Sequence, residues 1–271
     1  MGMKRIALAL AVAGALAMEQ AQAADGLSLG VGVDYSSGDY GTDTTTDILS
    51  VPFTAKYVSG HWTWKATLPW LRVKGDPNVI PGIGGVVNTN PNGRGRGNGN
   101  GNGGSGATTT EDGSASGIGD LRLAATYSFE TGGPLGVDLT ANFKVATADE
   151  DKGLGTGAND YGLAVDLYRA FGDTTVFGGV GYTLLGDSDY IDVDGVAGAN
   201  FGLSHKVSSG SVGAMYEWRQ AAADGFDDRS ELTGFYTFGT DPASKFQIYA
   251  TAGLSDGSPE WAGGVTYSHG F

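Results

Sequence analysis

Three histidines are the side chains in this sequence best suited to acid–base catalysis, and their positions argue against that role. His61 and His205 lie beside short turns between predicted strands, and His269 lies two residues from the carboxyl end. A His-activated serine would need its base within hydrogen-bond reach at one shared site. The chain has no cysteine, which excludes thiol nucleophiles and thiolate metal sites. We therefore expect no catalytic residue and no enzymatic activity.

Closely spaced aspartates supply the oxygen ligands that a calcium-binding loop requires. Four of them lie within residues 187–194, in one predicted loop. Ile191 stands where a calcium-binding loop would place a ligand, and the distal glutamate of such a loop is missing. Glycine-rich residues 178–181 lie inside a predicted strand without a following helix, which argues against a phosphate loop. The sequence thus predicts neither a metal nor a cofactor.

Charged residues also recur within segments that are otherwise apolar or small. A buried charge is tolerable only with water or with a partner of opposite sign, so these side chains would line a water-filled channel or form a salt-bridged plug. The candidate lumen-lining residues are Asp34, Lys56, Lys65, Arg122, Asp138, Lys144, Asp166, Glu217, Arg219 and Glu231.

Strands with two different faces are the elements that would position these charges. In residues 27–36, for example, Leu27, Leu29, Val31 and Val33 alternate with small or polar residues. Because successive side chains of a strand point to opposite faces, each such segment has one apolar face. Twelve segments of this kind follow one another down to Phe271.

Two architectures use such strands: a soluble sandwich and a closed transmembrane barrel. The segments run for about 9–13 residues, longer than the usual strand of a soluble sheet and long enough to cross a bilayer at a tilt. Aromatic residues gather at the ends of the apolar faces, as in the interfacial girdles of outer-membrane barrels. We therefore predict an all-β fold, a single antiparallel up-and-down transmembrane β-barrel of about twelve strands.

The first residues predict export. Lys4 and Arg5 precede an apolar run over residues 6–17, and Ala21-Gln22-Ala23 follows. This is the pattern of a cleaved signal peptide, residues 1–23, with the barrel in residues 24–271. A membrane-anchoring helix is the alternative, but twelve residues rise only about 18 Å against a hydrocarbon core of about 30 Å. The location we expect is the outer membrane of a Gram-negative bacterium.

Short and long connections alternate, which predicts the orientation. Outer-membrane barrels have short periplasmic turns and longer external loops, so both termini should be periplasmic and the acidic loops external. Residues 74–117 form the longest external loop, and its low-complexity Gly/Asn-rich tract, residues 88–106, contains Arg94 and Arg96. That tract could be a flap over the mouth or an unconstrained insertion. The apolar residues 79–87 before it are the better candidate for a constriction.

Several short strings carry a resemblance to a known family. They are Ser-Gly-Asp-Tyr-Gly at residues 37–41, Leu-Pro-Trp at 68–70, Gly-Ile-Gly-Asp at 117–120, Ala-Asp-Glu-Asp-Lys-Gly-Leu-Gly-Thr-Gly at 148–157 and Ser-Asp-Gly-Ser-Pro at 255–259. Together they resemble the outer-membrane barrel family named for the MetA pathway of phenol degradation, whose members are labelled transporters. The resemblance implies passage of small, hydrophobic or aromatic molecules and supplies no catalytic residues. Tyr267 and Phe271 at the carboxyl end resemble the signal that the barrel assembly machinery recognises.

The function we expect is a passive channel for small solutes, and the alternative is a non-conducting structural or adhesive surface barrel. The expected partners are outer-membrane lipid and lipopolysaccharide, the barrel assembly machinery and the solutes themselves. The formal net charge of −14 argues against nucleic acid, which requires a basic face.

Overall fold

The computed structural model describes residues 25–94 and 113–271, and its regular elements there are all strands. The predicted signal peptide, residues 1–23, and the greater part of the Gly/Asn-rich tract, with Arg96, lie outside these residues. The long strands are β1 (Gly26–Gly38), β2 (Thr46–Ser59), β3 (Trp62–Gly75), β6 (Gly113–Ile118), β7 (Leu121–Phe129), β8 (Leu135–Val145), β9 (Asp160–Phe171), β10 (Thr174–Leu184), β11 (Val196–Val207), β12 (Gly210–Arg219), β13 (Arg229–Gly239), β14 (Ser244–Gly253) and β15 (Trp261–Gly270). Among the described residues no helix is long and apolar enough to cross a membrane.

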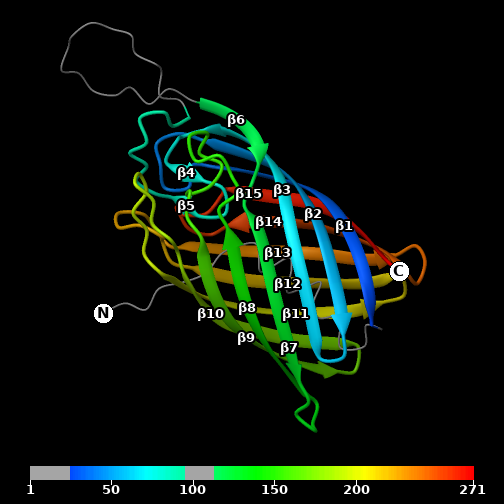
Figure 1. Ribbon diagram of the computed structural model, residues 1–271. Helices are drawn as coiled ribbons and strands as arrows, with labels where there is room; N and C mark the ends of the chain where they lie inside the picture. The colour runs from blue at the N-terminus through cyan, green and yellow to red at the C-terminus, as the bar shows by residue number, and fades with distance from the viewer. Residues whose placement is uncertain (1–24, 95–112) are drawn as a thin grey trace, which may run out of the picture.

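The strands close into one antiparallel barrel (Figure 1). Each strand pairs with its neighbours in chain order, and β1 pairs with both β2 and β15, which joins the two ends of the sheet. Both β6 and β7 pair with β3, one beyond the other, so they act as a single strand interrupted at Gly119 and Asp120. With β6 and β7 counted as one strand, the barrel therefore has twelve strands, which confirms the predicted fold class.

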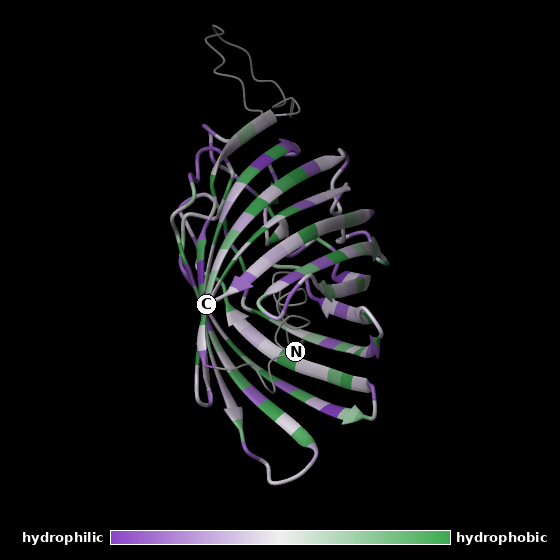
Figure 2. Cartoon of the chain, turned by 90° about the vertical axis from the view of Figure 1, so that its right-hand side faces the viewer, coloured by the Kyte–Doolittle hydropathy of each residue, from purple (hydrophilic) through white to green (hydrophobic). Residues whose placement is uncertain are grey.

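Alternation along each strand separates an apolar outside from a polar inside, and Figure 2 shows it as bands of contrasting hydropathy. On β1, for instance, Leu29 is 46% exposed and Val33 is 47% exposed on the outer face. On the inner face, threonines pair across neighbouring strands, such as Thr126 with Thr140 at 2.9 Å and Thr233 with Thr251 at 2.8 Å. Water is not needed to satisfy these hydroxyls, because each pair bonds within itself.

An aromatic cluster also occupies part of the interior. Phe177, Met215 and Phe235 are buried together, with Tyr168 and Tyr249 packed against them. Large rings fit there because glycines stand opposite them on the next strand: Phe177 is paired beside Gly202, and Phe235 faces Gly213. A Cβ at Gly202 or Gly213 would meet the ring tip at 2.6 or 2.3 Å. Glycine in these strands therefore makes room for rings inside the wall.

We expect Gly213→Ala to destabilise the barrel by about 1–3 kcal/mol, the usual cost of overpacking a filled interior. Its Cβ would collide with the ring of Phe235 and lie 2.6 Å from the backbone oxygen of Leu203, which cannot move aside. Gly234 is the matched control, because a Cβ there meets no atom within 4 Å. Urea unfolding of both variants in detergent tests this. Equal stability of the two would contradict the ring-over-glycine packing.

All the short connections lie at one end of the barrel and the long ones at the other, as the alternation of loop lengths predicts. The start of β1 and the end of β15 lie at the short-turn end, since Gly26 pairs with Val58 and Ser28 with Gly270. The longest loop is shorter than the predicted residues 74–117. Strand pairing extends into both of its ends, because β3 runs to Gly75 and β6 begins at Gly113.

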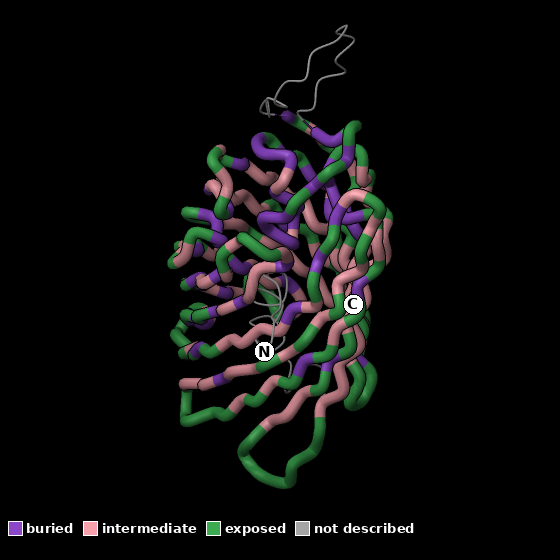
Figure 3. The backbone as a smooth tube through the Cα atoms, turned by 90° about the vertical axis from the view of Figure 1, so that its left-hand side faces the viewer, coloured by how far each residue is buried: buried purple, intermediate pink, exposed green. Residues whose placement is uncertain are grey.

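The long loops pack together over one mouth of the barrel. The short strands β4 (Val79–Ile80) and β5 (Gly84–Gly85) form a hairpin, called here the inner hairpin, that folds inward. Ile80 and Val86 from this segment join Ile191, Val193 and other residues in a buried apolar cluster. Figure 3 shows buried stretches among these loops. The apolar residues 79–86 are thus mostly buried, whereas Val87, the last residue of the predicted apolar segment, is exposed.

Candidate functional site

The ten charged residues proposed as lumen-lining lie on the inward face of their strands. The residues next to them in each strand include exposed apolar side chains that point outward. Because successive side chains of a strand alternate between its two faces, the charged side chains point inward. Their surroundings differ. Asp34, Lys65 and Arg122 line one cavity. Lys144 and Arg219 line a second cavity, which Arg122 also borders. Glu217 on β12 and Glu231 on β13 are buried. Lys56, Asp138 and Asp166 lie nearer the short-turn end.

Two cavities occupy the lumen below the long loops. The larger, about 280 Å³, is bounded by β1, β2, β3 and β7 on one side and by β13, β14 and β15 on the other. The smaller, about 110 Å³, lies toward β8–β12. Pro81, Gly82 and Arg122 border both cavities. The tip of the inner hairpin therefore divides the lumen, and we call the larger space the main cavity.

Arginine and glutamate side chains hold the tip of the hairpin. Arg219 donates from Nη1 to the carbonyl oxygen of Gly82 at 3.1 Å. Beside it, Arg229 donates to Glu231 from Nε at 3.0 Å and from Nη2 at 2.6 Å, and both side chains are buried. Glu217 lies directly opposite Glu231. This network places two cations and two anions in a low-dielectric interior, where pairing decides its stability.

Four cations form a row across the inner wall, called here the cationic stripe. Lys56 lies directly opposite Lys65, and Arg122 lies directly opposite Lys144. Lys65 and Arg122 are diagonal neighbours, because Lys65 pairs with Ala124, two residues from Arg122. Like charges that face each other repel, so the fold keeps this row at a cost in stability.

The end of the stripe nearest the long loops is neutralised. Lys144 Nζ lies 3.0 Å from Asp160 and 3.5 Å from Asp120, and donates to Thr156 at 2.9 Å. Asp120 also accepts from the backbone amides of Thr147 and Ala148, at 3.1 and 3.0 Å. Asp120 therefore fixes the interruption between β6 and β7 to the loop after β8.

Arg94 anchors the segment that carries the inner hairpin. Its Nη1 donates to the carbonyl of Gly153 at 3.1 Å, and its Nη2 donates to the carbonyls of Asp76 and Val79, at 3.0 Å for Val79. Burial lowers the pKa of Arg94 to about 10, against the opposing effect of Asp76, so the guanidinium stays protonated at neutral pH. The described part of the predicted low-complexity tract, residues 88–94, is thus ordered. Asparagine side chains supply its local bonds, as where Asn88 accepts from the amide of Asn90 at 2.9 Å.

We expect Arg94→Ala to raise the hydrogen-exchange rate of the Val79 and Val86 amides by about tenfold or more, since bonds to a charged donor contribute about 1.5–3 kcal/mol each. These amides close the turn and hairpin through Asp76 and Asn78, at 3.1 and 2.8 Å. Lys152→Ala is the control, because that exposed side chain pairs with Asp149 of its own loop. Unchanged exchange in the Arg94 variant would show that the apolar cluster alone holds the hairpin.

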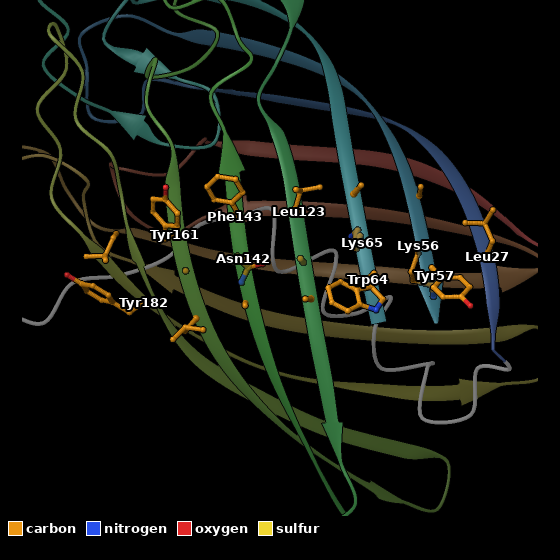
Figure 4. A pocket seen from close by; sticks show the side chains of 18 residues that line it. Leu27, Lys56, Tyr57, Trp64, Lys65, Leu123, Asn142, Phe143, Tyr161 and Tyr182 are labelled. Carbon is orange, nitrogen blue, oxygen red and sulfur yellow. The ribbon is translucent and has the colours of Figure 1, made fainter. Parts of the chain in front are cut away.

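A hollow of about 770 Å³ lies on the outer wall rather than in the lumen (Figure 4). Tyr57, Trp64, Phe143 and Tyr161 border it from β2, β3, β8 and β9, and alanines such as Ala66 form its floor. Most of its lining shares the outward face with the exposed apolar residues of the strands, and the inward-facing positions Lys56, Lys65 and Asn142 also border it. Lipid chains fill such a surface in a membrane, so we do not treat it as a solute site.

The histidines lie at the short-turn end and bond to neighbours. His205 Nδ1 lies 2.9 Å from Thr174 Oγ1, His269 Nδ1 lies 2.9 Å from Ser244 Oγ, and His61 lies 3.6 Å from Glu130. In residues 25–94 and 113–271, no group of three or more histidine or acidic side chains is placed to hold a metal ion. Asp187 instead accepts from the amide of Val193 at 3.0 Å, within its own loop.

Besides the interior aromatic cluster, sequence reasoning missed Tyr40, Asp120, Asp160, Arg229 and Tyr249, which border the cavities or bond to the charges there. Arg229 and Tyr249 occupy inward positions of their strands, so strict alternation would have found them. Asp120 and Asp160 stand at the edges of strands, where alternation gives no signal. Tyr40 lies in a loop with φ of 55° and turns inward onto the main cavity, which no period predicts.

Three solved structures are similar to this chain. CymD, a monoaromatic hydrocarbon channel, has a TM-score of 0.45 at 12% identity, over 100% of this chain and 95% of that one. The translocator domain of autotransporter NalP from Neisseria meningitidis has a TM-score of 0.52 at 13% identity, over 95% and 93%. The toluene transporter TbuX from Ralstonia pickettii has a TM-score of 0.48 at 11% identity, over 92% and 90%. At these identities the likeness to NalP shows the fold alone.

Sequence comparison identifies the family. No curated protein matches the sequence. The family model described as "Putative MetA-pathway of phenol degradation" matches residues 46–271, which cover all the strands after β1. The chain therefore belongs to this family of the MetA pathway of phenol degradation.

Proposed function

We propose that the protein is an outer-membrane barrel through which small aromatic solutes pass passively. The observation that carries this proposal is the main cavity, a space of about 280 Å³ inside a closed barrel. Its lining combines Tyr40 and Tyr249 with apolar side chains such as Leu71. An apolar cavity on the order of 150 Å³ can bind benzene, so the main cavity has room for one substituted ring. The phenol-degradation label of the family agrees with an aromatic solute.

The proposal includes an orientation. The short-turn end, with both chain ends, faces the periplasm, and the long acidic loops face outward, where their carboxylates contact lipopolysaccharide through divalent ions. Tyr267 and Phe271 form the signal read by the barrel assembly machinery. Support for this role is that Phe271 is 75% exposed while its amide donates to the carbonyl of Leu27 at 2.8 Å, beside the seam between β1 and β15. No enzymatic role is proposed, since the histidines bond to threonine, serine and glutamate at this end.

One observation favours the alternative, a non-conducting structural or adhesive barrel. The apolar cluster of Ile80, Val86, Ile191 and Val193, which includes part of the inner hairpin, packs over the mouth. A barrel filled in this way would resist flow, unlike the wide porins.

Conductance across a planar bilayer separates the two functions. The purified mature protein should give discrete, small conductance steps that detergent alone does not give. Silence at all voltages, both in the wild type and after removal of the inner hairpin, would leave the structural alternative.

A further inference from the structure

Two cations of the stripe have no acidic side chain in direct contact among the described residues. Among the described residues, neither Lys65 nor Arg122 forms an ion pair within 4 Å, whereas Lys144 has Asp120 and Asp160. Lys65 and Arg122 both line the main cavity. A charge removed from water without an opposite partner is costly, so these positions are unfavourable for the barrel by itself.

The other charges that line the main cavity are already engaged. Asp34 accepts a hydrogen bond from the hydroxyl of Tyr249 at 2.7 Å. Arg229 is bonded to Glu231 through two nitrogens. Outside ion pairs, the described lining of the cavity thus carries one acidic side chain, Asp34, against two cations, Lys65 and Arg122, which leaves an excess of positive charge. The two cations lie on adjacent strands as diagonal neighbours.

The remaining walls suit a flat apolar body. Tyr40 and Tyr249 border the cavity with Leu71, Ile80 and Pro81. A ring would lie against these side chains, while a carboxylate on the ring would receive the donors of Lys65 and Arg122. Neither a neutral hydrocarbon nor a small aliphatic anion matches both parts of this lining.

We propose that the main cavity is a binding site for small aromatic carboxylates, with Lys65 and Arg122 as the carboxylate donors. This substrate class rests on the proposed passage of aromatic solutes and narrows it. The net charge of −14 does not prevent it, because charges on the external loops are screened over a Debye length of about 8 Å at physiological salt. The loop charges lower the rate at which an anion approaches the barrel, but they do not change its contacts inside the main cavity.

Isothermal titration calorimetry of the folded barrel in detergent tests the site with three probes: benzoate, the neutral benzyl alcohol and the aliphatic acetate. Heats of titrating each probe into detergent alone are subtracted. Benzoate should bind at least about tenfold more tightly than either other probe, since an added charged hydrogen bond is expected to contribute a tenfold factor or more. The variant Lys65→Gln/Arg122→Gln should lose this preference.

Two further variants test whether the lost benzoate preference comes from the charges of the main cavity. Lys152→Gln/Lys206→Gln removes the same charge from exposed positions and should retain the benzoate preference. The single Lys65→Gln relieves repulsion from Lys56, so it should fold and still bind benzoate more weakly than the wild type. Equal affinities for benzoate and benzyl alcohol, or equal losses in the cavity and control variants, would overturn the inference.

The outcomes also separate this inference from the proposed function. A barrel that conducts but shows no benzoate preference overturns the aromatic-carboxylate site and leaves the channel intact. A barrel that binds benzoate as described but is silent in bilayers overturns passive passage and retains the binding site.

Discussion

Replacing residues 79–85 by two glycines should raise the single-channel conductance severalfold. These residues form the inner hairpin, and its tip at Pro81 and Gly82 separates the main cavity from the smaller one. Without it the two spaces join into one continuous lumen. The replacement is short enough to close, because the amide of Val86 already donates to the carbonyl of Asn78 at 2.8 Å. Glycines add no side chain to the opened space.

Planar-bilayer recordings of the wild type and this variant measure the effect. Val87→Ser is the control, because that side chain lies on the same segment but is 57% exposed, away from the lumen. Its conductance should equal that of the wild type. If the hairpin variant also conducts like the wild type, the narrowest point is elsewhere, and the interior aromatic cluster around Phe235 is the next candidate.

Arg229→Ala should cost about 3–5 kcal/mol of folding stability, the usual penalty for removing one partner of a buried ion pair. Arg229 is 6% exposed and Glu231 is 3% exposed, with their closest atoms 2.6 Å apart. The substitution leaves the Glu231 carboxylate without the two guanidinium donors of Arg229. Glu231 still lies directly opposite Glu217. Two facing carboxylates in the interior repel, so either the pair takes up a proton or the strands separate.

Urea unfolding of the barrel in lipid vesicles gives the free energy of this change. Arg169→Ala is the matched control, since that arginine lies over the ring of Phe171 at 4.8 Å on an exposed strand end and should cost no more than about 1 kcal/mol. Removing both partners, as Arg229→Ala/Glu231→Ala, should cost less than Arg229→Ala alone. Similar losses in the Arg169 and Arg229 variants would show that the buried pair does not stabilise β13.

The wall of the barrel could be predicted because its signal is local and repeated. A period of two places Leu29 and Val33 outside, and the same period places Lys65 and Arg122 inside. Strand length then distinguished a membrane barrel from a sandwich. The interior apolar cluster was missed because Phe235 and Met215 occupy positions of the polar face, and their glycine partners lie on other strands.

The filling of the lumen could not be predicted in the same way, because loops have no period. The inner hairpin was recognisable as apolar, but its contact with Arg219 joins residues 137 apart in the chain. The interruption at Gly119 and Asp120 likewise depends on bonds to a distant loop, through Thr147. Arg94 was read as part of a low-complexity tract, since composition does not reveal the carbonyls that a single side chain will reach.

A disulfide across the seam between the first and last strands tests the enclosed lumen most directly. Val33 lies directly opposite Val265, and such residues have Cα atoms about 4.5–5.5 Å apart, which suits a disulfide. The chain contains no cysteine, so Val33→Cys/Val265→Cys would report this contact alone. Oxidation in native membranes should link the pair, while Val33→Cys/His269→Cys stays reduced, because His269 pairs instead with Leu29. If the first pair fails to link in folded protein, β1 and β15 are free edges, and no enclosed cavity exists for a solute to cross.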